Sequence, residues 1–518
     1  MSAPQKSDAR RPAAGTLEVG SEPLRVADVV SVARGDARVA ISSEPALRAR
    51  IEAGRRALEA ALEKGERVYG VTTGVGASQG REVGEAERHQ ATRNLLRFHG
   101  CGTGRVLDPE EAAAVVVTRL ASLARGYSAV RLPVLERLCE LLDRRILPRI
   151  PEEGSVGASG DLTPLSYVGA LLVGEREAWV GGEERPAREA LEGAGLAPLE
   201  LEPKESLAIM NGTSVMTALA CLAIERAERL ARWAAALTAL NLRAVSGNPG
   251  HFDPTIFALK PHPGTLRASD WIRADLEPAA ELKPARLQDV YSLRCAPHVL
   301  GVLLDAVEGA RGHVEVELNG VNDNPIVDPD TGRILHGGNF YGGHVAFAMD
   351  GLKSAVAGVA DLLDRQMQLL CAPASSGGLP ENLSAGNHAE HGFKAMGIST
   401  SALAAEALKG TMPAASFSRS TESHNQDKVS MGTIAARDCR RLLELSETVA
   451  AIVQLAGCQA LELRGEPPGD GPSRRLCETL RRAVPPLHAD RRQDLDIDTV
   501  LGLYRTGALP LDLDPTPA

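Results

Sequence analysis

Long stretches of the chain repeat apolar residues at every third or fourth position, which is the spacing of one face of an α-helix. The clearest run extends from Leu352 to Leu370, and similar runs extend from Leu219 to Leu240 and from Leu442 to Ala460. Apolar stripes of this length are typical of bundles of long helices. Several of these segments carry Ala and Gly on more than one face, which suits helices that pack on all sides in a core or at a subunit interface.

Alternating patterns typical of strands are rare, and Arg38–Ser42 is the best example. Polar, glycine-rich stretches instead interrupt the helical segments, at residues 69–80, 100–104, 154–160, 319–343 and 416–427. Binding and catalytic groups are often held on such loops by a rigid scaffold. We therefore predict a mainly α-helical fold whose loops carry the chemistry.

This pattern divides the chain into a loop-rich N-terminal part and a helical remainder. We predict a disordered lead-in at 1–20, an N-terminal domain at 21–205, a bundle of long helices with further C-terminal helices at 206–510, and a frayed tail at 511–518. The lead-in is polar and lacks the apolar centre of a secretory signal. We therefore expect a cytoplasmic protein.

Composition and charge narrow the class of partner. The 518 residues are 44% hydrophobic and 24% charged, and the net charge of −10 is spread along the chain without a basic block. This argues against binding to nucleic acid or to an acidic membrane surface and favours a small-molecule partner. The eight cysteines have no zinc-binding spacing and the segment His388–His391 does not fit a zinc motif, so we expect no metal.

The loop GSVGASGDLTPLSY, which begins at Gly154, contains a candidate for unusual covalent chemistry. If the backbone nitrogen of Gly160 attacks the carbonyl carbon of Ala158, a five-membered ring closes. Loss of water from that carbon and from the Ser159 side chain then leaves an alkene conjugated to an imidazolone, which is a strong electrophile. Glycine permits the close approach, serine supplies the leaving hydroxyl, and Asp161 is placed to assist the proton movements. The tripeptide alone is equally compatible with an ordinary Gly/Ser turn.

The wider sequence decides between these interpretations. The loop resembles the signature of the histidine and aromatic amino acid ammonia-lyase and aminomutase superfamily, whose cofactor is 4-methylidene-imidazol-5-one. Further motifs of that superfamily follow in order within residues 25–505: YGVTTGVG at 69, NLLRFHGCGTG at 94, MNGTS at 210, QDVYSLRC at 288, NDNP at 322, HGGNF at 336 and ESHNQDKVSMG at 422. The resemblance implies an ammonia-lyase/fumarase-like fold and a homotetramer whose active sites combine loops from more than one chain.

The resemblance also implies catalytic roles. Ala158, Ser159 and Gly160 match the residues that form the cofactor without help from another protein, and Asp161 follows them directly. Tyr69 matches the catalytic base, on a loop flanked by glycines. A tyrosine has an ordinary pKa of about 10, so its surroundings must activate it before it can take a weakly acidic proton.

Other matched positions belong to the substrate pocket. Arg294 matches the arginine that holds the substrate carboxylate, a task suited to a planar guanidinium. Tyr291 and Asn211 match residues near the electrophile, where the asparagine would donate a hydrogen bond to the ring carbonyl. The remaining matched pocket residues are Gln288, Asn324 and Phe340.

The substrate is predicted from the pair Phe98–His99 and from the residues near the amino group. Phenylalanine enzymes of the superfamily tend to an apolar pair and histidine enzymes to Ser-His, whereas tyrosine enzymes place a histidine at one of the two positions, which suits a phenol. Gln426 stands where histidine lyases carry an acid, and Glu422 matches the acidic position of the aromatic lyases. Val75 replaces the usual phenylalanine of the Tyr69 loop, so the packing of that loop stays open.

We therefore predict an ammonia-lyase that converts L-tyrosine to 4-coumarate, with L-phenylalanine to cinnamate as an open second reaction. The main alternative is a tyrosine or phenylalanine 2,3-aminomutase, in which ammonia returns to the β-carbon. A histidine ammonia-lyase is a further alternative, and a helical scaffold protein without activity is the last.

Overall fold

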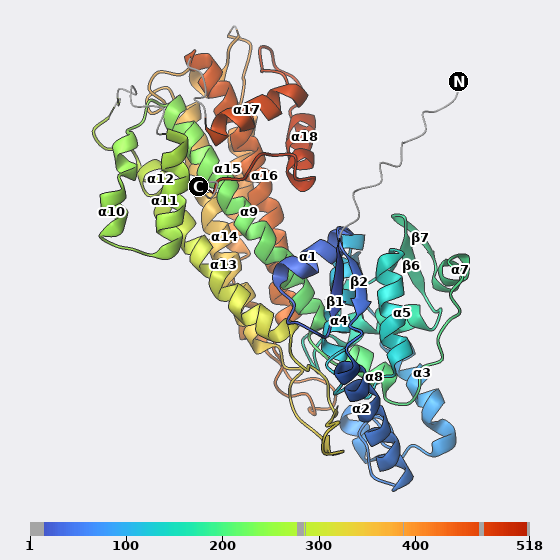
Figure 1. The fold of residues 1–518 in the computed structure, drawn as a ribbon. Helices are drawn as coiled ribbons and strands as arrows, with labels where there is room; N and C mark the ends of the chain where they lie inside the picture. The colour runs from blue at the N-terminus through green and yellow to red at the C-terminus, as the bar shows by residue number, and fades with distance from the viewer. Residues whose placement is uncertain (1–14, 277–283, 285, 387, 466–470, 515–518) are drawn as a thin grey trace, which may run out of the picture. The chain divides into compact units, whose positions relative to one another are not determined.

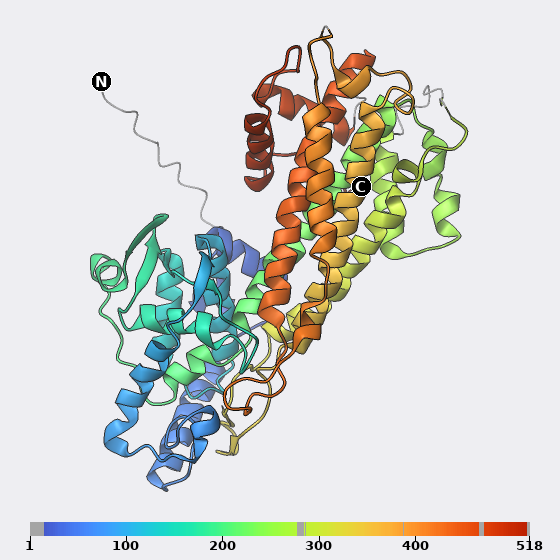
Figure 2. The same cartoon turned by 180° about the vertical axis from the view of Figure 1, so that it is seen from behind.

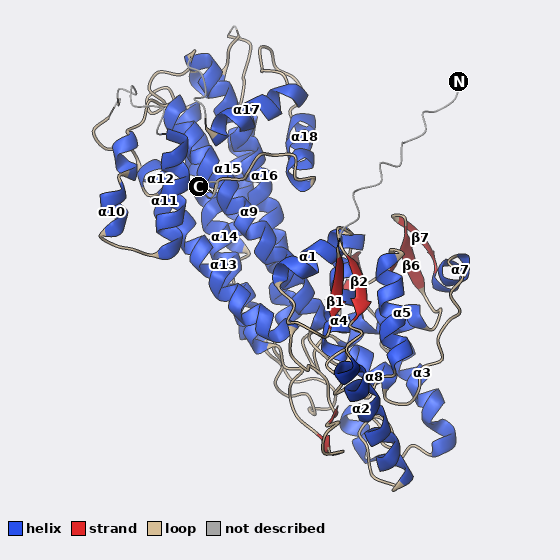
Figure 3. Cartoon of the chain, viewed as in Figure 1, coloured by secondary structure: helices blue, strands red, loops and turns tan. Residues whose placement is uncertain are grey.

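The computed structural model describes residues 15–276, 284, 286–386, 388–465 and 471–514. Helices dominate and strands are short (Figure 3), which confirms the prediction of a mainly α-helical fold. The chain forms two compact units. Unit 1 consists of Met1–Leu222, Gly312–Phe347 and Ala414–Arg437, and unit 2 consists of Ala223–Arg311, Ala348–Pro413 and Asp438–Ala518.

Unit 1 contains short helices and small sheets joined by long loops (Figure 1). Its helices are α1 (Val26–Arg34), α2 (Pro45–Glu63), α3 (Arg88–Phe98), α4 (Pro109–Leu123), α5 (Leu132–Asp143), α6 (Leu162–Leu172), α7 (Ala187–Gly193) and α8 (Glu205–Met210). Its strands are β1 (Thr16–Val19), β2 (Arg38–Ile41), β3 (Thr103–Val106), β4 (Ile146–Pro148), β5 (Pro151–Glu153), β6 (Glu177–Val180), β7 (Glu183–Pro186), β8 (Ile326–Val327) and β9 (Ile334–Leu335).

Local sequence signals explain where several of these elements begin. Helix α4 starts at Pro109 after Asp108, whose side chain accepts a hydrogen bond from the Glu111 backbone nitrogen, while the Glu111 side chain accepts one from that of Asp108. This reciprocal pair satisfies two amide groups that a helix start leaves free. Strand β3 pairs antiparallel with β5, so the chain leading into the Ala-Ser-Gly loop starts from a fixed strand.

Unit 2 is a bundle of long helices with shorter ones around it (Figure 2). The long helices, whose ends belong to unit 1, are α9 (Ser214–Ala244), α13 (Ala296–Leu318), α14 (Gly343–Cys371) and α16 (Gly432–Arg464). The shorter helices are α10 (Pro254–Ala258), α11 (Pro263–Leu276), α12 (Tyr291–Arg294), α15 (Lys394–Lys409), α17 (Pro472–Ala483) and α18 (Asp494–Arg505). The three apolar stripes of the sequence lie in α9, α14 and α16, as predicted.

The core of the bundle is mostly apolar, and several of its buried polar side chains pair with one another. Trp233 is fully buried, and its indole nitrogen donates to the side-chain oxygen of Gln454 at 2.7 Å. Gln366 accepts a hydrogen bond from Asn241 at 2.8 Å and donates one to Thr238 at 3.0 Å. Since buried polar groups are costly without partners, these pairs fix how the long helices pack.

Both chain ends are more ordered than the sequence suggests where the structure describes them. Within the expected lead-in, β1 pairs in parallel with β2. Within the expected frayed tail, Asp514 accepts hydrogen bonds from Arg232 at 2.6 Å and from Trp271 at 3.0 Å. Residues 1–14 and 515–518 of these two segments lie outside the described residues. Among the described helices, none combines the length and the apolar character needed to cross a bilayer.

Candidate active site

The Ala158-Ser159-Gly160 tripeptide lies in unit 1, in the loop between β5 and α6. Ser159 and Gly160 both have left-handed backbone conformations, with φ angles of 54° and 76°. A side chain on Gly160 would collide with the carbonyl group of Gly212, and that carbonyl accepts a hydrogen bond from the Asp161 backbone nitrogen at 2.7 Å. Only glycine fits this close backbone approach, and the serine before it is held in a strained geometry.

Two amide side chains contact Ser159 from different parts of the sequence. Asn211 donates from Nδ2 to the Ser159 carbonyl oxygen at 3.2 Å, and Gln426 donates from Nε2 to the Ser159 hydroxyl at 3.2 Å. The Oδ1 atom of Asn211 is buried, and no partner for it occurs among the described residues. If the tripeptide cyclises, the Ser159 carbonyl becomes the ring carbonyl, so the Asn211 amide already lies where such a ring needs a donor.

Asp161 anchors the end of the tripeptide. Its carboxylate is completely buried and accepts hydrogen bonds from the backbone nitrogens of Val215 and Met216, each at 2.9 Å, in the first turn of α9. It also accepts hydrogen bonds from Ser155, at 3.3 Å, and from Thr433. Burial raises the pKa of Asp161 to about 6, and these hydrogen bonds act in the opposite direction.

Tyr69 and Glu422 meet at the glycine-rich loop that follows Tyr69. The Gly76 backbone nitrogen donates to the Tyr69 hydroxyl oxygen at 2.7 Å, and the Ala77 backbone nitrogen donates to the two Glu422 carboxylate oxygens at 2.8 and 3.0 Å. Burial raises the pKa of Tyr69, the Gly76 hydrogen bond lowers it, and the charge of Glu422 raises it further. The net pKa lies above its ordinary value, so Tyr69 holds its proton at neutral pH.

One short turn carries both Glu422 and Gln426. Thr421 and Gln426 exchange backbone hydrogen bonds, and Glu422, Ser423 and His424 between them have φ angles of 50°, 54° and 63°. Successive left-handed residues other than glycine are unfavourable, so surrounding contacts must hold this turn. The turn therefore places the Glu422 carboxylate at the Tyr69 loop and the Gln426 amide at Ser159.

Phe98 and His99 lie at the end of α3, with ring centroids 4.4 Å apart. The His99 carbonyl oxygen accepts a hydrogen bond from Ser166 of α6 at 3.3 Å. Burial, and then the charge of Arg176, lowers the pKa of His99 to about 4. His99 is therefore a neutral imidazole at physiological pH, with one nitrogen that donates a hydrogen bond and one that accepts.

Three of the matched pocket residues lie in unit 2 and are grouped there. Arg294 stacks over the Tyr291 ring at 4.6 Å and donates from Nε to the Asp289 carbonyl oxygen at 2.9 Å. Tyr291 is 70% exposed, and Gln288 is also exposed. These groups are thus accessible within the single chain.

Two further matched pocket residues, Asn324 and Phe340, lie in the 319–343 loop of unit 1. Asn324 accepts a hydrogen bond from the Gly337 backbone nitrogen at 2.9 Å, which closes this loop on itself. Phe340 is half-buried. The same contact orients the Asn324 side chain, whose amide nitrogen supplies the hydrogen-bond donors.

Sequence reasoning missed several residues that hold the tripeptide loop. Thr433 and Ser155 donate to Asp161, and Arg119 lies completely buried in α4 with its guanidinium against the backbone of Gly212. A single arginine inside the apolar run of α4 was an available signal, because a buried cation needs a special reason. The two hydroxyls carried no such signal, since serine and threonine are common in loops and helix starts.

Comparison with known proteins shows the family to which the chain belongs. The profile of the family named "Aromatic amino acid lyase" matches residues 24–483. The chain belongs to this family. The lyase-family chain is 40% identical over 491 residues to histidine ammonia-lyase of Gloeobacter violaceus, covering 94% of this chain and 95% of that protein.

The fold of the chain is also similar to solved structures of lyases and aminomutases. The lyase-family chain superimposes on tyrosine aminomutase from Streptomyces globisporus with a TM-score of 0.89 at 35% identity, covering 96% of this chain and 98% of that one. It matches histidine ammonia-lyase from Trypanosoma cruzi with a TM-score of 0.86 at 30% identity, covering 96% and 94%. The chain is therefore an enzyme of the ammonia-lyase class, in a family that includes both lyases and aminomutases.

Proposed function

We propose that this enzyme eliminates ammonia from L-tyrosine to give 4-coumarate, with L-phenylalanine as a slower second substrate that gives cinnamate. The observation that carries the choice of tyrosine is the pair Phe98–His99 at the end of α3. Phe98 offers an apolar face to an aromatic ring, and the neutral imidazole of His99 can pair with a phenol hydroxyl. A site that hydrogen-bonds a hydroxyl discriminates strongly against a substrate that lacks it.

We propose 4-methylidene-imidazol-5-one, formed from Ala158, Ser159 and Gly160, as the cofactor. Three observations support it. The Ser159 backbone is left-handed, Gly160 lies too close to the Gly212 carbonyl to carry a side chain, and Asn211 donates a hydrogen bond to the Ser159 carbonyl oxygen. When formed, this group supplies an electrophile that makes the substrate amine a better leaving group. Asn211 would hold it in place by a hydrogen bond to its ring carbonyl oxygen, whereas the Ser159 hydroxyl that now accepts from Gln426 is lost when the ring forms.

The remaining roles belong to the side chains of the protein. Tyr69 would take the β-proton at its hydroxyl oxygen, after losing its own proton. Arg294 would bind the substrate carboxylate, with Tyr291 stacked beneath it. Gln288, Asn324 and Phe340 would complete the pocket, two as polar contacts and one as an aromatic wall.

We also propose a homotetramer with sites shared between chains. Exposed apolar side chains on the bundle would gain from burial at such an interface: Val302 of α13 is 61% exposed and Ile398 of α15 is 68% exposed. Sharing would let unit 2 groups such as Arg294 serve a tripeptide loop of another copy.

A second candidate is 2,3-aminomutase activity on the same substrate. The hydrogen bonds from Ala77 to Glu422 favour it, because they tie the Tyr69 loop to the turn that carries Gln426. A loop that stays in place retains the arylacrylate long enough for ammonia to add back at the β-carbon. The similarity to solved structures named as tyrosine and phenylalanine aminomutases also supports this candidate.

Histidine is a third possible substrate, because the curated relatives at 35–40% identity are named histidine ammonia-lyases. Gln426 argues against it. Its neutral amide contacts Ser159 at the position where histidine lyases place an acidic group, and Phe98 offers no polar atom to an imidazole substrate.

The decisive experiment incubates the purified enzyme separately with L-tyrosine, L-phenylalanine and L-histidine. Arylacrylate absorbance and chromatography for β-amino acids are followed in the same samples. Coumarate that accumulates alone supports the proposal, and β-tyrosine that precedes coumarate assigns an aminomutase. Urocanate formed faster than either product contradicts the interpretation of Phe98, His99 and Gln426.

Replacing His99 with leucine is expected to shift the ratio of kcat/KM for tyrosine over phenylalanine toward phenylalanine by about tenfold or more, because the phenol loses its partner. The matched control is His89→Leu, which removes an exposed histidine from the same helix. The ratio should stay constant between about pH 5 and 8 in the unchanged enzyme, since His99 is neutral above its pKa of about 4. An unchanged ratio in His99→Leu would refute this assignment.

Replacing Glu422 with glutamine is expected to shift the ascending limb of the kcat/KM profile against pH toward lower pH. The substitution keeps an acceptor for the Ala77 nitrogen but removes the charge that raises the pKa of Tyr69. Tyr69 must be deprotonated to act as a base, so a lower pKa moves the limb down. Asp427→Asn, in the same exposed segment, is the control and should leave the limb in place.

A further inference from the structure

The first two turns of α16 contact the segment that carries the Ala-Ser-Gly loop. The Thr433 hydroxyl donates to Asp161 at the C-terminal end of the loop and lies 3.2 Å from the Ser155 hydroxyl near its N-terminal end (the near end). At the near end, Arg437 donates from Nη2 to Glu152 at 3.1 Å and to Glu153 at 3.3 Å. Positions 433 and 437 are one helical turn apart and so lie on the same face of α16.

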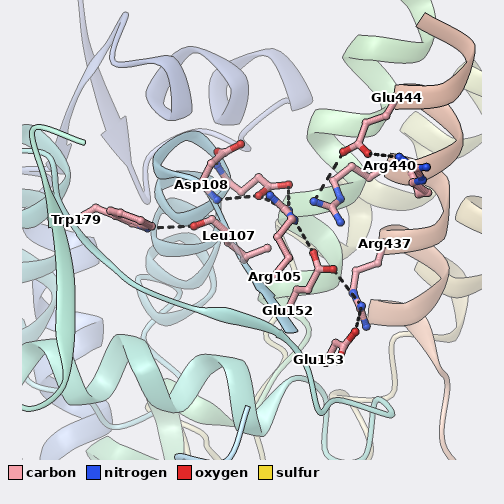
Figure 4. Close-up of polar contacts among 11 residues, drawn as sticks. Arg105, Leu107, Asp108, Glu152, Glu153, Trp179, Arg437, Arg440 and Glu444 are labelled. Atoms are coloured by element: carbon pink, nitrogen blue, oxygen red, sulfur yellow. Dashed lines mark hydrogen bonds and ion pairs between the residues drawn. The ribbon is translucent and has the colours of Figure 1, made fainter. Parts of the chain in front are cut away.

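The near end is also held from the other side (Figure 4). Arg105 of β3 donates from Nε to Glu152 at 2.9 Å and contacts both carboxylate oxygens of Glu111, at 2.6 and 2.7 Å. Glu152 therefore lies between two arginines. The side chain of Glu152 is only 9% exposed, and that of Arg437 is 19% exposed, so water screens this contact less than an ordinary surface ion pair.

The loop between these two ends needs such support. This short, glycine-rich segment has left-handed φ angles at Gly154, Gly157, Ser159 and Gly160. Such a conformation is unfavourable for the serine. A chain of this kind gains much conformational freedom if either end is released. Ring closure requires the Gly160 nitrogen to stay close to the Ala158 carbonyl carbon, and small displacements of reacting groups carry large rate penalties.

We propose that Arg437 is a positioning residue for formation of the cofactor: by binding Glu152 and Glu153, it holds the loop in the geometry that closes the ring. This inference rests on the cofactor chemistry of the proposed function. A bond forms between the Gly160 nitrogen and the Ala158 carbonyl carbon. That carbonyl oxygen leaves as water with the amide protons of Gly160 and Ser159, and a double bond forms between the Ala158 carbonyl carbon and the Ser159 nitrogen. Ser159 loses its hydroxyl and its α-proton as a second water. No oxidant or reductant takes part.

The test measures this dehydration directly. The full chain is synthesised in a cell-free system, and samples are denatured at intervals for intact-mass measurement, in which cofactor formation appears as the loss of two water molecules. Arg437→Met is expected to dehydrate about tenfold more slowly or worse than the unchanged chain. Arg437→Lys should fall between them, because an ammonium keeps the charge but lacks the rigid planar guanidinium that places Nη2 beside both carboxylates.

The matched control is Arg441→Met, one turn further along α16. Arg441 also contacts two carboxylates, those of Glu406 and Glu444, but neither belongs to the tripeptide loop. It should dehydrate at the unchanged rate. Melting temperatures of all variants separate slow ring closure from general loss of folding, and if Arg437→Met does not fold, Arg437→Lys decides.

The inference is overturned if folded Arg437→Met or Arg437→Lys dehydrates as fast as the unchanged chain, or if Arg441→Met is slowed equally. An unchanged chain that never loses two waters refutes the proposed cofactor itself. The two failures are therefore distinguishable, and neither depends on a measurement of turnover.

Discussion

Replacing Ser159 with alanine is expected to abolish cofactor formation and turnover together. The variant retains the Ala158 carbonyl and the Gly160 nitrogen but has no hydroxyl to lose, so no exocyclic alkene can form. Without that electrophile the amine is a poor leaving group, and kcat should fall by roughly 10⁴-fold or more. Intact mass and arylacrylate absorbance, measured on the same preparation, check both halves of the expectation.

The fold should survive this substitution. The Ser159 hydroxyl accepts one hydrogen bond from Gln426, whereas Asp161 holds the loop through several buried contacts that do not involve it. A melting temperature close to that of the unchanged enzyme would therefore show that lost chemistry, and not lost structure, explains the result. Turnover at the unchanged rate would contradict a covalent role for Ser159.

Replacing Tyr69 with phenylalanine is expected to separate the two properties that Ser159→Ala loses together. The variant should still lose two waters, because none of the described contacts of Tyr69 reaches the tripeptide. Its kcat should fall by about 10³-fold, since a positioned base typically contributes 10²–10⁴-fold. Rapid quenching with the preferred substrate measures the effect on the chemical step.

Tyr127→Phe is a suitable control for that measurement. Tyr127 lies in unit 1, and its backbone carbonyl accepts a hydrogen bond from the Val327 backbone nitrogen, which phenylalanine preserves. The control should be fully active. If Tyr69→Phe retained the unchanged kcat, the base would have to be another group, and the raised pKa of Tyr69 would have no catalytic meaning.

The sequence predicted the helical part of the fold well, because the evidence was local. The stripes from Leu219, Leu352 and Leu442 lie in α9, α14 and α16, where burial of one helical face needs no distant information. Strand β1 was missed within the expected lead-in. Its order depends on pairing with β2, and strand pairing is a non-local contact that residue patterns near Thr16 do not report.

The candidate site was predicted from motifs, and the structure adds its geometry. It brings Asn211 and Gln426 to Ser159, and Glu422 to the Tyr69 loop, although these residues are far apart in the sequence. Their catalytic roles stay predictions. The supports of the loop, Thr433 and Arg437, were not predicted, because a hydroxyl or an arginine at the start of a helix has many ordinary uses and only its three-dimensional neighbours reveal this one.

The contacts of the tripeptide loop also set an order of events during synthesis. Gln426 follows Ser159 by 267 positions, and Thr433 follows Asp161 by 272 positions. A nascent chain therefore lacks these contacts until most of it has left the ribosome. Under the proposed cofactor chemistry, a cyclised molecule would carry a chemical record that it once folded correctly, and the fraction of dehydrated chains in a preparation would count the molecules that did so.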